Sequence, residues 1–118
     1  MSVAYLIGDP VAHSLSPAMQ NAAFAHAGLP HRYEALRVAA RDLRAALERL
    51  RADDVLGANV TIPHKERVVR FLDTTDEEVR RLGAANTIVR RAGVLHGENT
   101  DGAGFAGALA ERGVRPAG

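Results

Sequence analysis

The sequence has no cysteine among its 118 residues. This absence excludes a disulfide framework, a thiolate zinc site and a cysteine nucleophile. Long apolar runs are also missing, because no stretch approaches the roughly 20 residues of a membrane-spanning helix, and the N-terminus shows no signal-peptide pattern. With 15 basic and 14 acidic residues, the net charge of +1 does not indicate a nucleic-acid partner. We therefore expect a cytoplasmic chain that binds neither nucleic acid nor membrane.

Lysine is the scarcest of the charged residue types. Lys65 is the only lysine, and the other fourteen basic residues are arginine. Lysine can exchange a proton near neutral pH in a suitable environment, whereas arginine stays charged. Lys65 is therefore a candidate for a role in proton transfer that arginine could not fill.

The pattern of apolar residues predicts alternating strands and helices. We expect strands over residues 3–8, 31–38 and 55–62, helices over 16–28 and 41–52, a short helix from 63, and a further helix after a capping box of Thr75 and Glu78. Residues 85–90 and 94–97 are expected to form a hairpin, and a last helix is expected near 101–112. This order predicts a three-layer α/β/α domain with a mostly parallel sheet that contains one antiparallel strand.

The length fits one domain. We assign residues 1–112 to this domain and interpret residues 113–118 as the start of a connection to a further domain that the chain does not contain.

Serine is rare, and its positions are informative. Two of the three serines, Ser14 and Ser16, follow the first predicted strand where a helix is expected to begin. Hydroxyl groups and free backbone N–H groups at a helix start favour an anion such as a carboxylate or phosphate. The alternative is that Ser16 only caps the helix and Ser14 is an ordinary loop residue.

The third predicted strand carries a second polar cluster. Asn59 lies in an apolar strand, where asparagine is unfavourable, so we expect its side chain to have a hydrogen-bonding partner. Lys65 is expected in the first turn of the next helix, the end at which the helix dipole disfavours a cation and favours loss of a proton. His64 beside it, like His13, is expected to line the same pocket. The alternative for Lys65 is an exposed side chain paired with Glu66.

Two further polar residues mark strand ends. Asn86 stands at the start of one predicted strand, and Asp101 follows the last one. Each alone fits turn or cap chemistry. Ligands of open α/β sheets bind beyond the carboxyl ends of the strands, and all four polar clusters fall at such junctions. We therefore expect them to form one binding site.

Cofactor and metal signals are weak. Residues 102–107 fit the pattern G-x-G-x-x-G, but the chain ends before the strand and acidic residue that a dinucleotide-binding unit requires, so we assign no nucleotide to them. The five histidines show no metal-ligand spacing. We expect no cofactor-binding residue and no metal site in this chain.

Four segments together are similar to a known family. The segments HSLSP (13–17), NVTIPHK (59–65), GAANT (83–87) and NTDGAGF (99–105) resemble, in order and spacing, the substrate-binding domain of shikimate dehydrogenase. The resemblance extends from about residue 4 to 112. It implies the reversible, NADP-dependent reduction of 3-dehydroshikimate to shikimate in the pathway to chorismate and the aromatic amino acids.

The resemblance also implies residue roles. Lys65 and Asp101 match the catalytic pair, in which the lysine moves the proton. Ser14 and Ser16 match the hydroxyls that hold the substrate carboxylate, and the ligands of the ring hydroxyls are matched by Asn59, Thr61, Asn86 and Asp101. The substrate-binding set is therefore Ser14, Ser16, Asn59, Thr61, Lys65, Asn86 and Asp101.

The chain departs from the family in two ways. Gln20 precedes Asn21 where the family usually has histidine, and the Rossmann domain that binds NADP in the family is absent. We therefore expect the chain alone to bind shikimate weakly and to lack dehydrogenase activity. One alternative is a quinate/shikimate dehydrogenase that uses NAD or NADP; an alternative of another class is a stand-alone ligand-binding or association module, and in either case two copies could form a homodimer.

Overall fold

A computed structural model describes residues 2–9, 16–61 and 63–100, and for Ser16 it describes the backbone only. The regular elements in chain order are β1 (Ser2–Gly8), α1 (Ser16–His26), β2 (His31–Arg37), η1 (Ala40–Asp42), α2 (Leu43–Arg49), β3 (Val55–Val60), η2 (Val69–Phe71), β4 (Thr74–Thr75), α3 (Glu77–Leu82), β5 (Thr87–Arg91) and β6 (Val94–Glu98). The last helix predicted near 101–112 and the connection at 113–118 lie outside this range. No helix in the described range is long and apolar enough to span a bilayer.

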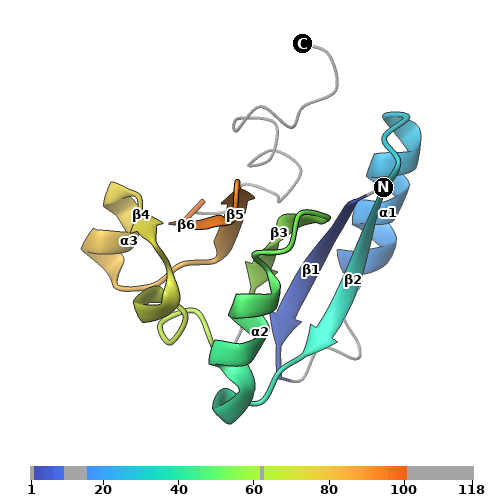
Figure 1. The fold of residues 1–118 in the computed structure, drawn as a ribbon. Helices are drawn as coiled ribbons and strands as arrows, with labels where there is room; N and C mark the ends of the chain where they lie inside the picture. The colour runs from blue at the N-terminus through green and yellow to red at the C-terminus, as the bar shows by residue number, and fades with distance from the viewer. Residues whose placement is uncertain (1, 10–15, 62, 101–118) are drawn as a thin grey trace.

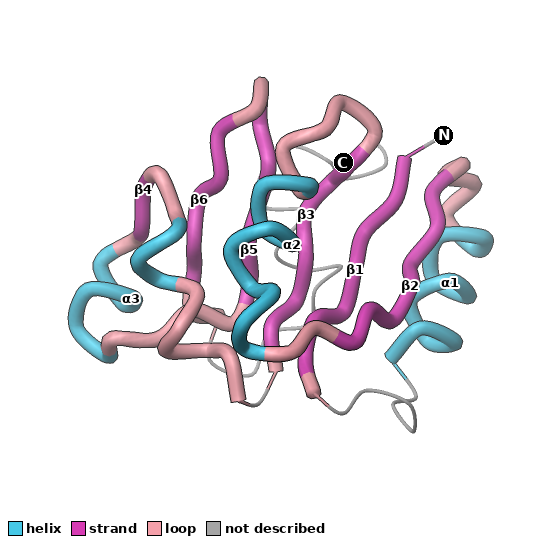
Figure 2. Tube along the Cα trace, turned by 60° about the horizontal axis from the view of Figure 1, so that its bottom comes forward, coloured by secondary structure: helices cyan, strands magenta, loops and turns pink. Residues whose placement is uncertain are grey.

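The strands form one six-stranded sheet in the order β2-β1-β3-β5-β6-β4 (Figures 1 and 2). β1 pairs in parallel with β2 and β3, and β4 pairs in parallel with β6. β5 is antiparallel to both of its neighbours, β3 and β6. The prediction of a mostly parallel sheet with a single antiparallel strand is confirmed for the described residues.

Helices cover both faces of the sheet. Side chains alternate between the two faces along a strand, and β1 shows this directly. Val3 and Ile7 pack with the α2 residues Leu43 and Leu47. On the opposite face, three β1 and β2 residues pack with Phe24 of α1; they are Ala4, Leu6 and Tyr33. The predicted three-layer arrangement is therefore present.

The β5–β6 hairpin has a two-residue turn. Ala92 and Gly93 both have positive φ angles, of 50° and 78°. This conformation at both central turn positions matches the right-handed twist of paired strands. The hairpin that the sequence predicted is confirmed, with its turn at these two residues.

Two sequence-based helix predictions need correction. Residues 63–68 form turns followed by η2, and a regular helix does not begin at Pro63. The cap of α3 is Asp76, whose carboxylate accepts a hydrogen bond from the Val79 N–H at 2.8 Å, so the capping box at Thr75 was placed one residue too early. Asp and Thr are both good N-caps, and here β4 holds Thr75 in the sheet.

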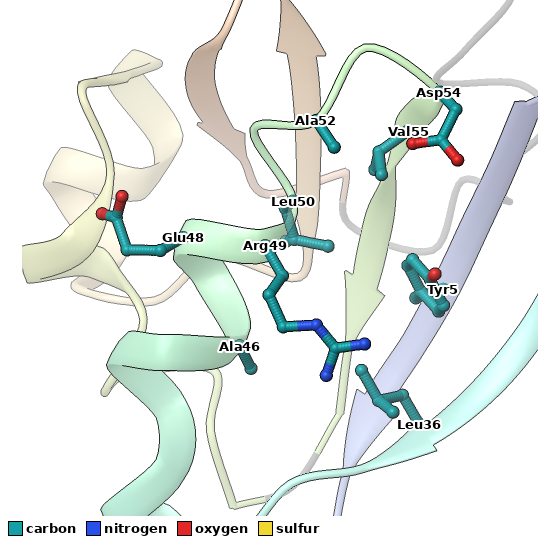
Figure 3. A pocket seen from close by; sticks show the side chains of 9 residues that line it. All are labelled: Tyr5, Leu36, Ala46, Glu48, Arg49, Leu50, Ala52, Asp54 and Val55. Atoms are coloured by element: carbon teal, nitrogen blue, oxygen red, sulfur yellow. The ribbon is translucent and has the colours of Figure 1, made fainter.

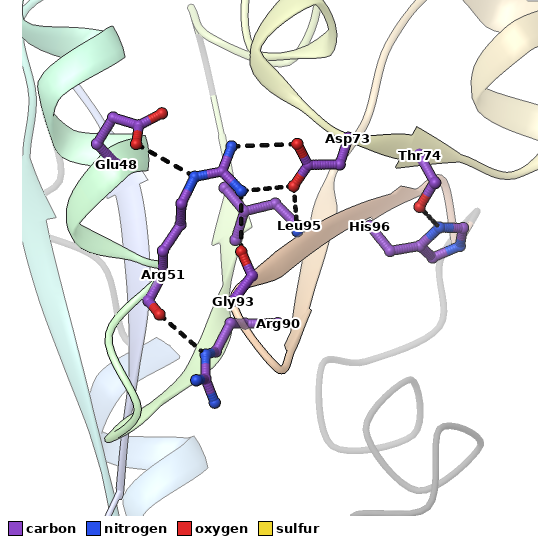
Figure 4. A network of polar contacts seen from close by, with 8 residues as sticks. All are labelled: Glu48, Arg51, Asp73, Thr74, Arg90, Gly93, Leu95 and His96. Atoms are coloured by element: carbon purple, nitrogen blue, oxygen red, sulfur yellow. Dashed lines mark hydrogen bonds and ion pairs between the residues drawn. The ribbon is translucent and has the colours of Figure 1, made fainter.

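A network around Arg51 joins the turn after α2 to the hairpin (Figure 4). The Arg51 guanidinium donates to both carboxylate oxygens of Asp73, at 2.5 and 3.3 Å, and to the carbonyl of Gly93 at 2.9 Å. Asp73 in turn accepts from the Leu95 N–H at 2.8 Å. These contacts connect segments 22 to 42 residues apart in the sequence. Bidentate arginine–carboxylate pairs are geometrically specific, so this network helps fix the position of the hairpin.

The network predicts a contribution to acid stability. The Arg51 guanidinium, and then the Leu95 N–H, lower the pKa of Asp73 below its usual value. A carboxyl whose pKa is lower in the folded state stabilises the fold above its unfolded pKa of about 3.9, and this contribution is lost as the pH falls through the lowered folded value. We expect the urea midpoint of Asp73→Asn to fall less between pH 5 and pH 2, measured by circular dichroism, than that of the unsubstituted chain.

Asp53→Asn is the matched control for this experiment. Asp53 also pairs with an arginine, Arg90, at 2.8 Å, but its side chain is fully exposed. Exposed pairs contribute little to stability, so this variant should keep the pH profile of the unsubstituted chain. Equal profiles for all three proteins would contradict the role given to Asp73.

Candidate functional site

Polar residues meet at the carboxyl edge of the sheet, where β1, β3 and β6 end and β5 begins. Asn59 of β3 pairs with Thr87 of β5. The Val60 N–H donates to the Asn86 carbonyl at 2.9 Å, and the Asn86 N–H donates to the Glu98 carbonyl at 3.0 Å. Lys65 is joined to the same edge because its carbonyl accepts from the Ala85 N–H at 2.8 Å. We call Asn59, Thr61, Lys65, Asn86, Asn99 and Thr100 the carboxyl-edge cluster.

Asn59 has the partner that its strand position required. The Tyr33 hydroxyl lies 2.9 Å from Asn59 Oδ1 and donates to it. The Asn59 Nδ2 lies 3.5 Å from both the Asn86 carbonyl and Thr87 Oγ1. Asn59 Oδ1 already accepts the hydrogen bond from Tyr33, and the contacts of Nδ2 are long. The NH₂ group is therefore the part of Asn59 that can bind a ligand.

Asn86 has a similar arrangement. Its Oδ1 accepts from Thr87 Oγ1 at 3.0 Å, from the Thr100 N–H at 3.1 Å and from Thr100 Oγ1 at 3.3 Å. Three donors on one oxygen fix the orientation of the carboxamide. Asn86 therefore also presents donors to a ligand. Two such carboxamides, one in β3 and one directly before β5, suit a ligand that is rich in hydroxyl or carbonyl oxygens.

Lys65 is held by its backbone while its side chain is exposed. The His64 N–H donates to the Thr61 carbonyl at 3.0 Å, and the Val68 N–H donates to the His64 carbonyl at 3.0 Å. These bonds make a compact turn, but they do not make a helix N-terminus. The expectation that Lys65 lies in the first turn of a helix is therefore wrong, and the structure places its backbone at the carboxyl edge of the sheet.

His64 does not line a pocket. Its side chain is fully buried, and its Nε2 is hydrogen-bonded to the Val38 carbonyl just after β2. The expectation that His64 faces the site was wrong because the turn directs His64 and Val68 into the core and the three residues between them into solvent. His64 instead ties the Lys65 turn to the connection between β2 and η1.

The site has a buried second layer that the sequence did not reveal. Tyr33 and Thr87 are 1 % and 0 % exposed, yet both hydrogen-bond with residues of the carboxyl-edge cluster. Burial raises the pKa of the Tyr33 phenol above its ordinary value, so the group stays a protonated donor. Only one feature of the sequence indicated this layer. A buried tyrosine hydroxyl needs a hydrogen-bonding partner, and so does an asparagine in an apolar strand such as Asn59.

Several predicted residues cannot be placed. Ser14, Asp101 and His13 lie outside the described residues, as does the glycine pattern 102–107, and of Ser16 only its place at the start of α1 is described. Thr61 is placed at the cluster by its N–H, which donates to the Ile7 carbonyl at 2.9 Å. Of the predicted set, the structure thus brings together Asn59, Thr61, Lys65 and Asn86.

A cavity elsewhere in the fold is distinct from this cluster. A space of about 450 Å³ lies between α2 and the sheet, lined among others by Tyr5, Arg49 and Asp54 (Figure 3). Asp54 and Val55 are at the amino end of β3, so this cavity opens near the edge opposite Asn59. It has no part in the site built from the polar residues.

The described residues offer little to a metal or a dinucleotide. No group of three or more His, Asp or Glu side chains in that range could hold a metal ion. A dinucleotide needs a glycine-rich turn between a strand and a helix, and the described connections from β2 to η1 and from β4 to α3 contain no glycine. These two connections therefore lack the turn that a dinucleotide requires.

Comparisons with known proteins agree on one family. The family model described as the shikimate dehydrogenase substrate binding domain matches residues 6–88. The shikimate dehydrogenase (NADP(+)) of Symbiobacterium thermophilum is 54 % identical over 113 residues, which cover 96 % of this chain and 38 % of that protein. The chain thus spans about two fifths of the length of the curated relatives that it matches.

Solved structures with similar sequences share this fold and have more than one name. Shikimate 5-dehydrogenase of Thermus thermophilus, in complex with NADP(H) and shikimate, is 41 % identical with a TM-score of 0.83, over 96 % of this chain and 43 % of that chain. The 5-ketofructose reductase of a Gluconobacter strain is 36 % identical, also with a TM-score of 0.83, over 93 % of this chain and 40 % of that one.

Proposed function

Because the chain belongs to the family of shikimate dehydrogenase substrate-binding domains, we propose that it binds shikimate and 3-dehydroshikimate and supplies the proton-transfer group of an NADP-dependent dehydrogenase. The observation that carries this proposal is the carboxyl-edge cluster. It joins two oriented carboxamides and the only lysine by hydrogen bonds between neighbouring segments.

The proposed roles follow from what each group can donate or accept. The Asn59 and Asn86 carboxamides, with Thr61 and Asp101, bind the hydroxyl groups of the ring. Ser14 and Ser16 bind the carboxylate, since Ser16 begins α1 and hydroxyls and free N–H groups at a helix start favour anions. Arginine is the usual choice for a carboxylate, but arginine is not among the proposed site residues.

Lys65 and Asp101 are the proposed catalytic pair. In the reduction, the ammonium group of Lys65 gives a proton to the carbonyl oxygen of 3-dehydroshikimate, and Asp101 holds the lysine and the hydroxyl in place. In the reverse direction the lysine removes the hydroxyl proton. A positioned acid or base of this kind contributes typically ~10²–10⁴-fold to the rate.

The hydride donor of the proposed reaction is NADP, which we place on a separate domain, as the share of the relatives covered by this chain supports. We also propose that the cofactor is NADP and not NAD, and that the protein is cytoplasmic. We predict that it binds neither nucleic acid nor a membrane. We further predict that two copies associate, which light scattering will measure.

We expect the isolated chain to bind shikimate with a Kd on the order of 1 mM, about −4 kcal/mol. Titration of ¹⁵N-labelled protein, followed by NMR, should shift signals of Asn59, Asn86 and Lys65 while NADP shifts none. Turnover of shikimate with NADP by the chain alone should be undetectable. Absence of shikimate-induced shifts at tens of millimolar, with the protein folded, would overturn the proposal.

A substrate other than shikimate is the second candidate, favoured by one finding. The structure titled 5-ketofructose reductase has the same TM-score as the shikimate 5-dehydrogenase, 0.83. Fold alone therefore does not decide the substrate. Parallel titrations with shikimate, quinate and 5-ketofructose will rank them, and we expect shikimate to bind more tightly than 5-ketofructose, which has no carboxylate for the two serines.

A further inference from the structure

We propose that Tyr33 is a positioning residue for ligand recognition: its hydroxyl orients the Asn59 carboxamide so that the NH₂ group, and not the oxygen, is presented to a ligand oxygen. The identity of the ligand rests on the proposed function, whereas the orientation of Asn59 does not. None of the four segments that carry the family resemblance contains Tyr33.

Tyr33 reaches the site from a non-adjacent strand. The sheet order places β1 between β2, which holds Tyr33, and β3, which holds Asn59. Tyr33 pairs with Ala4 of β1 and Asn59 pairs with Leu6. The tyrosine side chain therefore extends across β1, past the small side chain of Ala4, to place its hydroxyl 2.9 Å from Asn59 Oδ1.

Tyr33 is itself held rigidly. Asn21 of α1 accepts from the Tyr33 N–H at 2.7 Å and donates to the Tyr33 carbonyl at 2.9 Å. The side chain is 1 % exposed and packs with Phe24 and Leu6. A chain of contacts thus runs from α1 through Tyr33 to Asn59. A group fixed in this way loses little entropy when it orients a neighbour.

The orientation of Asn59 is specified from two sides. A flipped carboxamide would place its oxygen 3.5 Å from the Asn86 carbonyl oxygen, which can only accept hydrogen bonds. It would also remove the acceptor that now faces the Tyr33 hydroxyl. With Tyr33 in place, the amide donors face Asn86 and Thr87, which are the neighbours of Asn59 at the carboxyl edge.

The test is Tyr33→Phe, which removes one oxygen atom and keeps the ring. Tyr5→Phe is the matched control, because Tyr5 is the only other tyrosine and lines the cavity on the opposite face of the sheet. The chain has four asparagines, so ¹⁵N-asparagine labelling resolves their side-chain NH₂ signals individually. We expect the Asn59 pair to move or broaden in Tyr33→Phe and to stay unchanged in Tyr5→Phe.

Binding provides the readout that a merely structural role would not move. We expect Tyr33→Phe to raise the shikimate Kd about 10-fold, on the order of one lost hydrogen bond, and Tyr5→Phe to leave it unchanged. In an Asn59→Ala background, Tyr33→Phe should have no further effect on Kd. Asn59→Asp keeps an acceptor for Tyr33 but has no NH₂ group, and it should bind shikimate as poorly as Asn59→Ala.

The outcomes separate the two proposals. If the unsubstituted chain binds no shikimate, the proposed function fails, while the Asn59 NH₂ signals still test the orientation. An unchanged Asn59 signal in Tyr33→Phe, or an equal loss of affinity with and without Asn59, would overturn the inference. Should Tyr33→Phe not fold, Asn59→Asp decides, because shikimate binding equal to that of the unsubstituted chain would show that the NH₂ donor is not needed.

Discussion

Gly57→Ala is expected to lower the free energy of unfolding by about 3–5 kcal/mol, a large share of the total for a domain of this size. An alanine Cβ at this position would lie 2.0 Å from the carbonyl oxygen of Ile88 and 3.1 Å from its carbonyl carbon. Both atoms belong to the backbone of β5, so no side-chain rotation can relieve the clash. The strands would have to separate where β3 pairs with β5 in the centre of the sheet.

The substitution should also disturb the site. Asn59 follows Gly57 by two residues on the same strand, and its NH₂ contacts residues at the start of β5. A shift between these strands would lengthen those contacts. Urea unfolding monitored by circular dichroism will measure the stability, and a shikimate titration of any folded fraction will measure the effect on binding.

Gly28→Ala is the matched control. Gly28 has φ +72°, but a Cβ built on it has nothing within 4 Å. Its substitution costs only the backbone strain of a left-handed residue, about 1–2 kcal/mol. If Gly57→Ala is no more destabilising than Gly28→Ala, the close approach of β3 to β5 is not as described.

Lys65→Arg is expected to lower kcat by ~10²–10⁴-fold and to change KM little. Arginine keeps the positive charge but does not release a proton in the pH range of enzymes. Because the chain alone should be inactive, the measurement requires a chimera in which residues 1–112 replace the corresponding part of the Symbiobacterium thermophilum enzyme. That relative is 54 % identical over the aligned residues, so the two parts should fit together.

Arg67→Lys is the control in the same turn. Arg67 is exposed like Lys65 and lies two residues along the chain, and its substitution should leave kcat unchanged. The double variant with Lys65→Arg and Arg67→Lys should be as inactive as the single one, since a lysine two residues away does not reach the same atom. A chimera with Lys65→Arg that retains kcat would exclude Lys65 as the proton donor.

The sequence was sufficient for the elements whose signals are local. The helix expected over residues 16–28 is present as α1, and the hairpin expected from residues 85–90 and 94–97 is present as β5 and β6. Local signals did not identify the N-cap of α3, because two neighbouring residues were both suitable. Thr75 and Asp76 are both good N-caps, and the pairing of Thr75 with Gly97 in the sheet decided for Asp76.

The sequence also predicted the site only in part, because local signals do not show which distant residues come into contact. Asn59 in an apolar strand indicated that a partner must exist, but the sequence could not say that the partner was Tyr33, 26 residues earlier. His64 and Lys65 are adjacent and both polar, and only the turn showed that one is buried and the other exposed.

By itself, the sequence determined the α/β class, the polar residues at the strand ends and the resemblance that names their roles, because these depend on residue type and spacing along the chain. The tertiary structure decided which residues touch, namely Tyr33 with Asn59, Arg51 with Asp73 and His64 with Val38. Each of these contacts joins segments more than 20 residues apart, and strand order and register, which no local signal contains, bring them together.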